Sequence, residues 1–169
     1  MKCIDAIMSR RSIRRYTTDA VSDADIETVL HAAMAAPSAF NQQSWRFVVV
    51  RDAETRMRLS ETSQYSGMLA EAPVGIVVCA DTTAVRVEGY WVLDCAAAME
   101  NALLAVHALG LGGVWLGVHG YPERVAVVRA ACRLPSHIEP VAMIAFGHPE
   151  EAKPPANRYN PEFVHHDRW

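Results

Sequence analysis

The sequence predicts one domain in which α-helices and β-strands follow one another along the chain. Its 169 residues suit a single core, because a chain of this size hides roughly 70% of its unfolded surface. Hydrophobic residues make up 51% and charged residues 21%, which is typical of a folded globular protein. Apolar residues recur at helical spacing in several stretches, and short β-branched apolar runs separate them.

The first elements are two helices and a strand. Residues 3–9 have apolar side chains at helical spacing and predict a short helix. Ser22 begins a capping pattern for a second helix, which must end near Pro37 because proline disfavours helical backbone in the preceding residue. A polar loop at residues 38–44 leads into residues 45–50, whose apolar β-branched pattern predicts a strand.

The middle of the chain predicts a helical segment, a buried strand and a long helix. Residues 53–71 have a mostly helical pattern that is interrupted at Gly67. Residues 74–79 are continuously apolar, as in a strand covered on both faces. Residues 90–109 are apolar almost all round and predict a central helix ended by Gly110. Charged and polar residues within this helix argue against a membrane span.

Two further strands, at residues 113–118 and 141–146, enclose a helix that starts at Pro122 and continues to about Cys132. The remaining residues, 148–169, form a tail with four prolines and too few apolar groups to fold by itself. The tail nevertheless holds aromatic side chains that are unfavourable in water, so we expect it to wrap another surface, such as a second subunit. These are Tyr159, Phe163 and Trp169.

Charge and cysteine content limit the function classes. With a formal net charge of -3 and a pI near 6.1, the whole chain has no electrostatic basis for binding nucleic acid or an anionic membrane. The cysteines show no metal-ligand or redox spacing, and the first residues lack the apolar core of a signal peptide, which together predict the cytoplasm. Apolar neighbours predict buried structural thiols. The four cysteines are Cys3, Cys79, Cys95 and Cys132.

The stretch RRSIRR is the one dense basic cluster, in which Arg10, Arg11, Arg14 and Arg15 surround Ser12. Guanidinium groups this close repel one another and favour a multiply charged anion such as phosphate, with the serine hydroxyl as a further donor. A charge run can equally be a solvated basic face. The residues alone leave both interpretations open.

An amide-rich loop occupies residues 35–47. Asn41, Gln42 and Gln43 each offer donor and acceptor groups, which suit the edge of a flat heterocycle. The alternative is a loop whose amides satisfy its own turns.

The glycine-rich stretch at residues 110–120 is no dinucleotide fingerprint. Its glycines follow a helix and enter a strand, whereas the phosphate-binding fingerprint leaves a strand and enters a helix. Gly112, Gly113 and Gly117 do permit close approach of the backbone to a ligand or a neighbouring element.

Four ordered blocks, taken together, carry a resemblance that spans nearly the whole chain. They are RRSIR, then APSAFNQQSWRF, then DCAAAMENALLAVHALGLGGVWLG, and finally FGHPEEAKPP with a late arginine. In this order they resemble the FMN-dependent nitroreductase family, in its short, single-domain branch. The resemblance implies an α+β fold for residues 1–169, with a mostly antiparallel central sheet flanked by helices.

The resemblance also implies the site residues. The FMN phosphate would be held by Arg10, Arg11, Ser12, Arg14 and, from the tail, Arg158. The isoalloxazine ring would be covered by Pro37, Ser38, Asn41 and Gln43 of the other subunit of a homodimer, with the tail at residues 148–169 wrapping that subunit. Backbone N–H groups of Leu116 and Gly117 would face flavin N5.

The activity that the resemblance implies is a hydride transfer from NADH or NADPH through FMN to an organic acceptor, by a ping-pong mechanism. The acceptor would be a nitroaromatic, a quinone or an enone, and no catalytic acid, base, nucleophile or metal is expected, because the cofactor performs the chemistry. His107 is accordingly interpreted as a packing or surface residue. Unlike many members, this chain has no basic residue at residues 64–72 to stabilise the reduced flavin. Alternatives are a flavin reductase, a flavin-cleaving enzyme, or a non-catalytic protein that binds through residues 10–15.

Overall fold

The computed structural model describes residues 2–169, and its strands form one four-stranded sheet. The strands are β1 (Trp45–Val50), β2 (Val74–Asp81), β3 (Gly112–Gly117) and β4 (Ile138–Gly147), in the order β1-β2-β4-β3 across the sheet. Every pairing between neighbours is antiparallel, so the predicted α+β class with a mostly antiparallel sheet is confirmed.

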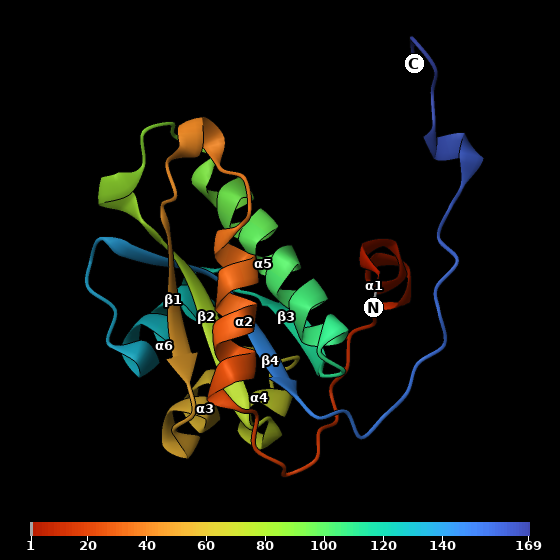
Figure 1. Cartoon of the computed structure of the whole chain (residues 1–169). Helices are drawn as coiled ribbons and strands as arrows, with labels where there is room; N and C mark the ends of the chain where they lie inside the picture. The colour runs from red at the N-terminus through yellow and green to blue at the C-terminus, as the bar shows by residue number, and fades with distance from the viewer. Residues whose placement is uncertain (1) are drawn as a thin grey trace.

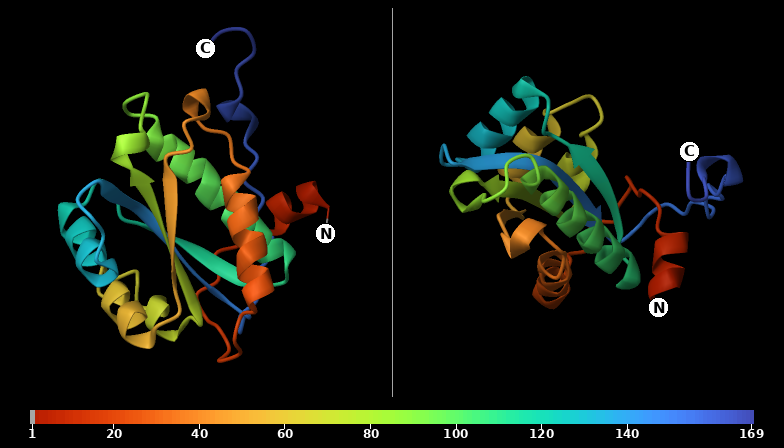
Figure 2. Two further views of the ribbon diagram at one scale, coloured as in Figure 1. Left: turned by 60° about the vertical axis from the view of Figure 1, so that its left-hand side comes forward. Right: turned by 90° about the horizontal axis from the view of Figure 1, so that it is seen from above.

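Helices cover both faces of the sheet (Figures 1 and 2). On one face lie α2 (Asp23–Met34) and α5 (Trp91–Ala108), and on the other lie α3 (Ala53–Ser60), α4 (Met68–Glu71) and α6 (Pro122–Cys132). Each face has its own cluster of buried side chains, which gives three layers with the sheet in the middle. We call these layers the body.

β2 explains the continuously apolar runs of the sequence. Val74, Ile76 and Val78 belong to the core on the α2 and α5 side, whereas Val77 and Cys79 belong to the core on the α6 side. Successive side chains of a strand face opposite sides of the sheet, so a strand covered on both faces has no exposed position for a polar residue.

α5 is the central helix, and its observed bounds differ from the predicted residues 90–109 by one residue at each end. Residues along its length are buried, among them Cys95, Met99 and Val106. Gly110 has a φ of 80°, a conformation that favours glycine and ends the helix. Within the described part of the chain, no helix is long and apolar enough to cross a membrane.

The helical segment at residues 53–71 is more interrupted than predicted. Residues 61–67 all lie outside α3 and α4, rather than Gly67 alone. The Arg56 guanidinium donates to the backbone carbonyls of Ala70 (3.2 Å) and Ala72, which ties the two helices together across the gap. Such a contact leaves no trace in local periodicity.

β4 begins at Ile138, earlier than the predicted start at residue 141, and therefore includes Pro140. The register with β2 shifts between Val78 and Cys79, next to this proline. A bulge of this kind lets a strand continue past a residue that has no backbone N–H to donate.

Two segments project from the body, namely α1 (Cys3–Ser9) and the tail at residues 148–169, and we call them the arms (Figure 2). The tail is extended apart from one short turn, η3 (Pro161–Phe163). Its aromatic side chains are largely exposed, as are the large apolar side chains of α1. Their exposed fractions are 77% for Tyr159, 79% for Phe163, 100% for Trp169 and 68% for Ile4.

Two of the four cysteine predictions are wrong. Cys79 and Cys95 are buried as predicted, and burial raises the pKa of each thiol to about 12. Cys3, however, is exposed on α1, and Cys132 is only partly buried at the end of α6. α1 projects from the body, so the apolar neighbours of Cys3 in sequence do not surround it with a core.

Candidate functional site

The arginine-rich segment is fixed against the start of β3 and the end of β4. The Ile13 N–H donates to the Gly113 carbonyl (3.0 Å), and the Tyr16 hydroxyl shares its proton between the carbonyls of Ile13 (2.5 Å) and Ala145 (2.9 Å). Gly112 allows this approach because it has no side chain; a Cβ at this position would clash with the Ile13 Cβ at 2.7 Å. Burial raises the pKa of Tyr16, so its hydroxyl remains a donor.

Two of the arginine side chains pair with carboxylates of distant elements. Arg10 Nε lies 3.2 Å from Glu100 Oε1 on α5, and Arg15 Nη2 lies 3.4 Å from Glu150 Oε2. Arg14 is exposed. Carboxylates supplied by distant elements thus accompany Arg10 and Arg15 and offset part of the repulsion expected from the sequence.

Arg11 gives the most informative contact of the cluster. Its Nε donates to the Pro154 carbonyl (2.9 Å) and its Nη1 to the Arg10 carbonyl. Its Nη2 is buried and has no hydrogen-bond partner among residues 2–169. A buried guanidinium N–H without an acceptor is unfavourable, and an oxygen of a bound anion would satisfy it. The residues at this corner thus fit a phosphate group.

Lys153 joins the cluster from the tail and was not predicted. Its Nζ donates to the Ser12 carbonyl (2.8 Å) and lies 3.2 Å from Glu151 Oε1. The Arg14 N–H donates to the same carboxylate (2.6 Å), and this bond and the Lys153 ammonium hold the pKa of Glu151 below its usual value. Arg158 lies further along the tail and is exposed, and no bond joins it to the cluster within the described residues.

The loop between α2 and β1 brings the predicted Pro37, Ser38, Asn41 and Gln43 together. The Gln43 N–H donates to Ser38 Oγ (3.0 Å), and Gln43 Nε2 donates to Asn41 Oδ1 (3.0 Å). Phe40, Asn41 and Gln43 have φ values of 49°, 54° and 48°. Left-handed backbone at non-glycine residues is unfavourable by about 1–3 kcal/mol each, and it is concentrated at ligand-contacting segments.

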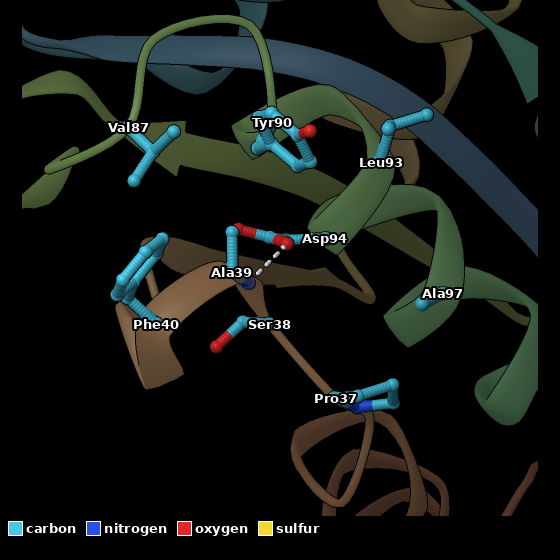
Figure 3. Close-up of a pocket in the computed structure, with 9 residues that line it drawn as sticks. All are labelled: Pro37, Ser38, Ala39, Phe40, Val87, Tyr90, Leu93, Asp94 and Ala97. Atoms are coloured by element: carbon cyan, nitrogen blue, oxygen red, sulfur yellow. Dashed lines mark hydrogen bonds between the residues drawn. The ribbon is translucent and has the colours of Figure 1, made fainter.

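Asp94 on α5 holds this loop in place. It is 4% exposed, and its Oδ1 accepts from the Ala39 N–H (2.9 Å; Figure 3). Its Oδ2 accepts from Gln42 Nε2 (2.5 Å). Gln42 Oε1 accepts in turn from the N–H groups of Arg86 (2.9 Å) and Val87 (3.2 Å). Gln42 is therefore a structural residue. The sequence signal for Asp94 was an acidic residue within an almost wholly apolar helix, where a carboxylate needs hydrogen-bond partners.

This loop and α5 line an open pocket of about 480 Å³ (Figure 3). Its wall is mostly apolar and includes Phe40, Tyr90 and Leu93, all of which are more than half exposed. Such a wall suits a flat apolar ligand or the surface of another subunit.

The open edge of β3 presents one of the two predicted backbone donors. The Val118 N–H donates to the Val141 carbonyl at the start of β4's pairing with β3 (3.1 Å). Backbone bonding alternates along an antiparallel pair, so the N–H of Leu116 also points toward β4, whereas the N–H of Gly117 points toward the open edge. The Gly117 carbonyl accepts from Arg124 Nη1 (3.0 Å), and this guanidinium lies 3.8 Å from the centre of the Tyr121 ring. Arg124 was not predicted, and it brings a positive charge to this edge.

His107 lies beside the arginine-rich segment rather than in a separate packing position. Its Nε2 lies 2.7 Å from the hydroxyl of Ser9, at the end of α1. Burial, followed by the charges of Arg10 and Arg11, lowers the pKa of His107.

An antiparallel sheet between two helical layers, with a cationic corner and a strained amide-rich loop beside it, defines an α+β protein built to hold an anionic, partly flat ligand. The sequence model described as the nitroreductase family matches residues 7–65 and 60–148. The chain belongs to the nitroreductase family, so the resemblance drawn from its sequence motifs is confirmed.

Individual relatives match over their full length. A protein of Archaeoglobus fulgidus, provisionally named NADH dehydrogenase/NAD(P)H nitroreductase, is 42% identical over 172 residues, covering 99% of each chain. A crystal structure of a provisionally named NADH oxidase from Clostridium acetobutylicum has a TM-score of 0.95 and 40% identity, covering 98% of this chain and all of its own. A provisionally named nitroreductase from Desulfovibrio desulfuricans, solved in complex with FMN, has a TM-score of 0.87 and 36% identity, covering 100% of this chain and 98% of its own.

Proposed function

We propose that this protein is an FMN-dependent oxidoreductase that takes electrons from NADH or NADPH and delivers them to an organic acceptor. The buried, unpartnered Nη2 of Arg11 is the observation on which the proposal rests, because it fits a phosphate oxygen. Membership of the nitroreductase family and the FMN complex of the Desulfovibrio relative support the choice of FMN as the anion.

The chain's own residues have distinct tasks in this proposal. Residues of the arginine-rich segment and of the tail bind the phosphate. Residues of the loop at residues 37–43 cover the ring from the partner subunit, and the edge of β3 orients the ring through a backbone N–H. They are Arg10, Arg11, Ser12, Arg14 and Arg158 for the phosphate, Pro37, Ser38, Asn41 and Gln43 for the ring, and Leu116 with Gly117 for the edge of β3. The ladder directs Leu116 toward β4, so we assign the ring-facing N–H to Gly117.

When bound, FMN supplies a ring nitrogen that accepts a hydride from the reduced nicotinamide and a reduced ring that passes it to the acceptor. The chain positions the ring, excludes water from its covered face and supplies positive charge nearby. Arg124 is the candidate for that charge, since residues 64–72 hold no basic side chain. We expect ping-pong turnover, because donor and acceptor would use the same space in succession.

A homodimer is part of this proposal. The arms leave large apolar side chains in water, and the loop at residues 37–43 lines a mostly apolar wall that one chain leaves open. A second copy that covers these surfaces would also complete the site, since each copy would lend its loop to the other. The cytoplasmic location and the class of acceptor, whether nitroaromatic, quinone or enone, remain predictions.

The test begins with the purified protein and added FMN. We expect a yellow protein whose flavin absorbance bleaches anaerobically when NADH or NADPH is added. Arg11→Ala should weaken FMN binding by about 1.5–3 kcal/mol, because a charge-assisted bond is lost, whereas Arg15→Ala, which removes an exposed side chain of the same segment, should have little effect. A protein that takes up no FMN would instead support the non-catalytic alternative.

A panel of acceptors offered to the pre-reduced protein then separates the enzymatic alternatives. Rapid reoxidation by a nitroaromatic, a quinone or an enone supports the proposed activity. Reoxidation by free flavin alone supports a flavin reductase, and loss of the flavin spectrum under oxygen supports a flavin-cleaving enzyme.

A further inference from the structure

His107 is joined to the end of α1 by a hydrogen bond whose direction can be assigned. The Ser9 hydroxyl lies 2.6 Å from the Asp5 carbonyl oxygen and 2.7 Å from His107 Nε2. A carbonyl can only accept, so the single hydroxyl proton goes to Asp5 and His107 must donate through Nε2–H. His107 Nδ1 has no hydrogen-bond partner among residues 2–169.

The charges that face His107 come from three elements. Arg10 and Arg11 follow Ser9 directly, and Glu100 lies on α5, where it pairs with Arg10 (3.2 Å). From the tail, Glu151 and Lys153 line the same cavity of about 270 Å³ as His107 and Arg11, and they pair with each other (3.2 Å).

Most of these charges cancel in pairs. Glu100 accompanies Arg10, and Glu151 accompanies Lys153, whereas no carboxylate among the described residues pairs with the Arg11 side chain. Burial and the two arginines act in the same direction on the imidazole and lower the pKa of His107. In the free protein the ring is therefore neutral at neutral pH.

We propose that His107 is a positioning residue of the phosphate site: it holds Ser9 through Nε2 in the free protein and takes up a proton when a phosphate dianion binds at the arginines. This inference rests on the proposed function, because it requires FMN, or another phosphate monoester, at this corner.

Protonation of His107 breaks none of the bonds described. The imidazolium still donates to Ser9 through Nε2, and the added proton goes to the unpartnered Nδ1. Burial of the ring and the charges of Arg10 and Arg11 oppose this protonation, and a dianion bound beside the arginines offsets their charges. FMN binding and proton uptake by His107 are thus linked. The affinity for FMN should rise as the pH falls through the range in which the His107 ring is neutral in the free protein and charged in the complex.

The experiment measures the dissociation constant of FMN from about pH 6 to pH 8 in the full-length protein and in His107→Gln. Glutamine keeps an N–H donor near the position of Nε2 but does not titrate in this range. We expect the native protein to bind FMN more tightly at the acidic end than the variant does, by up to about ten-fold for each unit by which binding raises the histidine pKa. The two proteins should converge at about pH 8.

Two controls isolate the effect. The phosphate of FMN titrates itself, with a second pKa near 6, but this contribution is common to both proteins and cancels in their ratio. Riboflavin, which lacks the phosphate, should bind both proteins with the same pH dependence. His31→Gln changes an exposed histidine on α2 and should reproduce the native profile.

Calorimetry in two buffers of different ionisation enthalpy counts the protons directly. Uptake in the native protein that is absent in His107→Gln supports the inference. Equal pH profiles and equal proton counts in the two proteins overturn it while leaving the proposed function intact. The proposed function fails as well if neither protein binds FMN, or if neither protein binds FMN more tightly than riboflavin.

Discussion

The body and the arms treat their apolar side chains in opposite ways. In the body, Phe146 and Met99 are fully buried between the sheet and its helices. On the arms, Phe163 is 79% exposed and Trp169 is 100% exposed. Complete burial of a large apolar side chain stabilises a fold by roughly 1.5–3 kcal/mol, and the arms gain none of this within one chain. The body is therefore stable through its own contacts, whereas the arms leave large apolar side chains uncovered within one chain.

The loop at residues 37–43 is an intermediate case. It also has an exposed aromatic residue, Phe40, but buried hydrogen bonds from Asp94 and Gln42 fix it to the body. Polar anchoring thus holds a strained segment in place before any partner or ligand arrives.

Removal of residues 156–169 should have the largest effect. The deletion takes away three exposed aromatic residues and Arg158, so we expect self-association to weaken by more than about a hundred-fold and FMN binding to weaken with it. Light scattering would report the shift toward the monomer. In dilute solution, where single chains dominate, circular dichroism should report an unchanged melting temperature, because the body is intact. A truncated protein that is still dimeric and yellow would contradict our division into body and arms.

The same substitution in both regions compares them directly. Phe146→Ala should lower the free energy of unfolding by about 3–5 kcal/mol, because it leaves a cavity in the core. Phe163→Ala should change it by less than about 0.5 kcal/mol in dilute solution, where single chains dominate, since that side chain touches little of its own chain. Urea titrations at two protein concentrations provide the measurement. A large effect of Phe163→Ala in dilute solution would mean that the tail stabilises its own body.

Asp94→Asn should have a smaller effect, confined to the loop. The substitution replaces charge-assisted bonds by neutral ones and turns an amide toward the Gln42 amide, so we expect a loss of about 1–3 kcal/mol. Amide hydrogen exchange at Ala39 should accelerate, while exchange in β2 should not. Glu27→Gln, at an exposed carboxylate on α2, serves as the control. Unchanged exchange at Ala39 would show that the loop keeps its conformation without the Asp94 carboxylate.

Local sequence signals predicted most of the elements, because those signals are physical causes of local structure. The β-branched run of β1 and the proline that begins α6 gave the bounds of these elements as the structure has them. The roles of Asp94 and His107 depend instead on partners 55 and 98 residues away. Residue spacing does not contain such contacts, so sequence reasoning counted Asp94 only as an argument against a membrane span and set His107 aside.

The arginine-rich segment shows the same limit in a different form. Its composition indicated an anion site, and the unpartnered Nη2 of Arg11 supports that interpretation. The carboxylates that accompany Arg10 and Arg15 come from α5 and from the residues after β4, so the charge balance of the corner could not be derived from residues 10–15 alone.

The strand order has a consequence for synthesis on the ribosome. β4 is the last strand to be translated, yet it lies between β2 and β3 and pairs with both. A nascent chain that ends before Ile138 can pair only β1 with β2 and must leave β3 without a neighbouring strand. The sheet therefore closes late in translation, and until then its unpaired strands are substrates for chaperones and proteases.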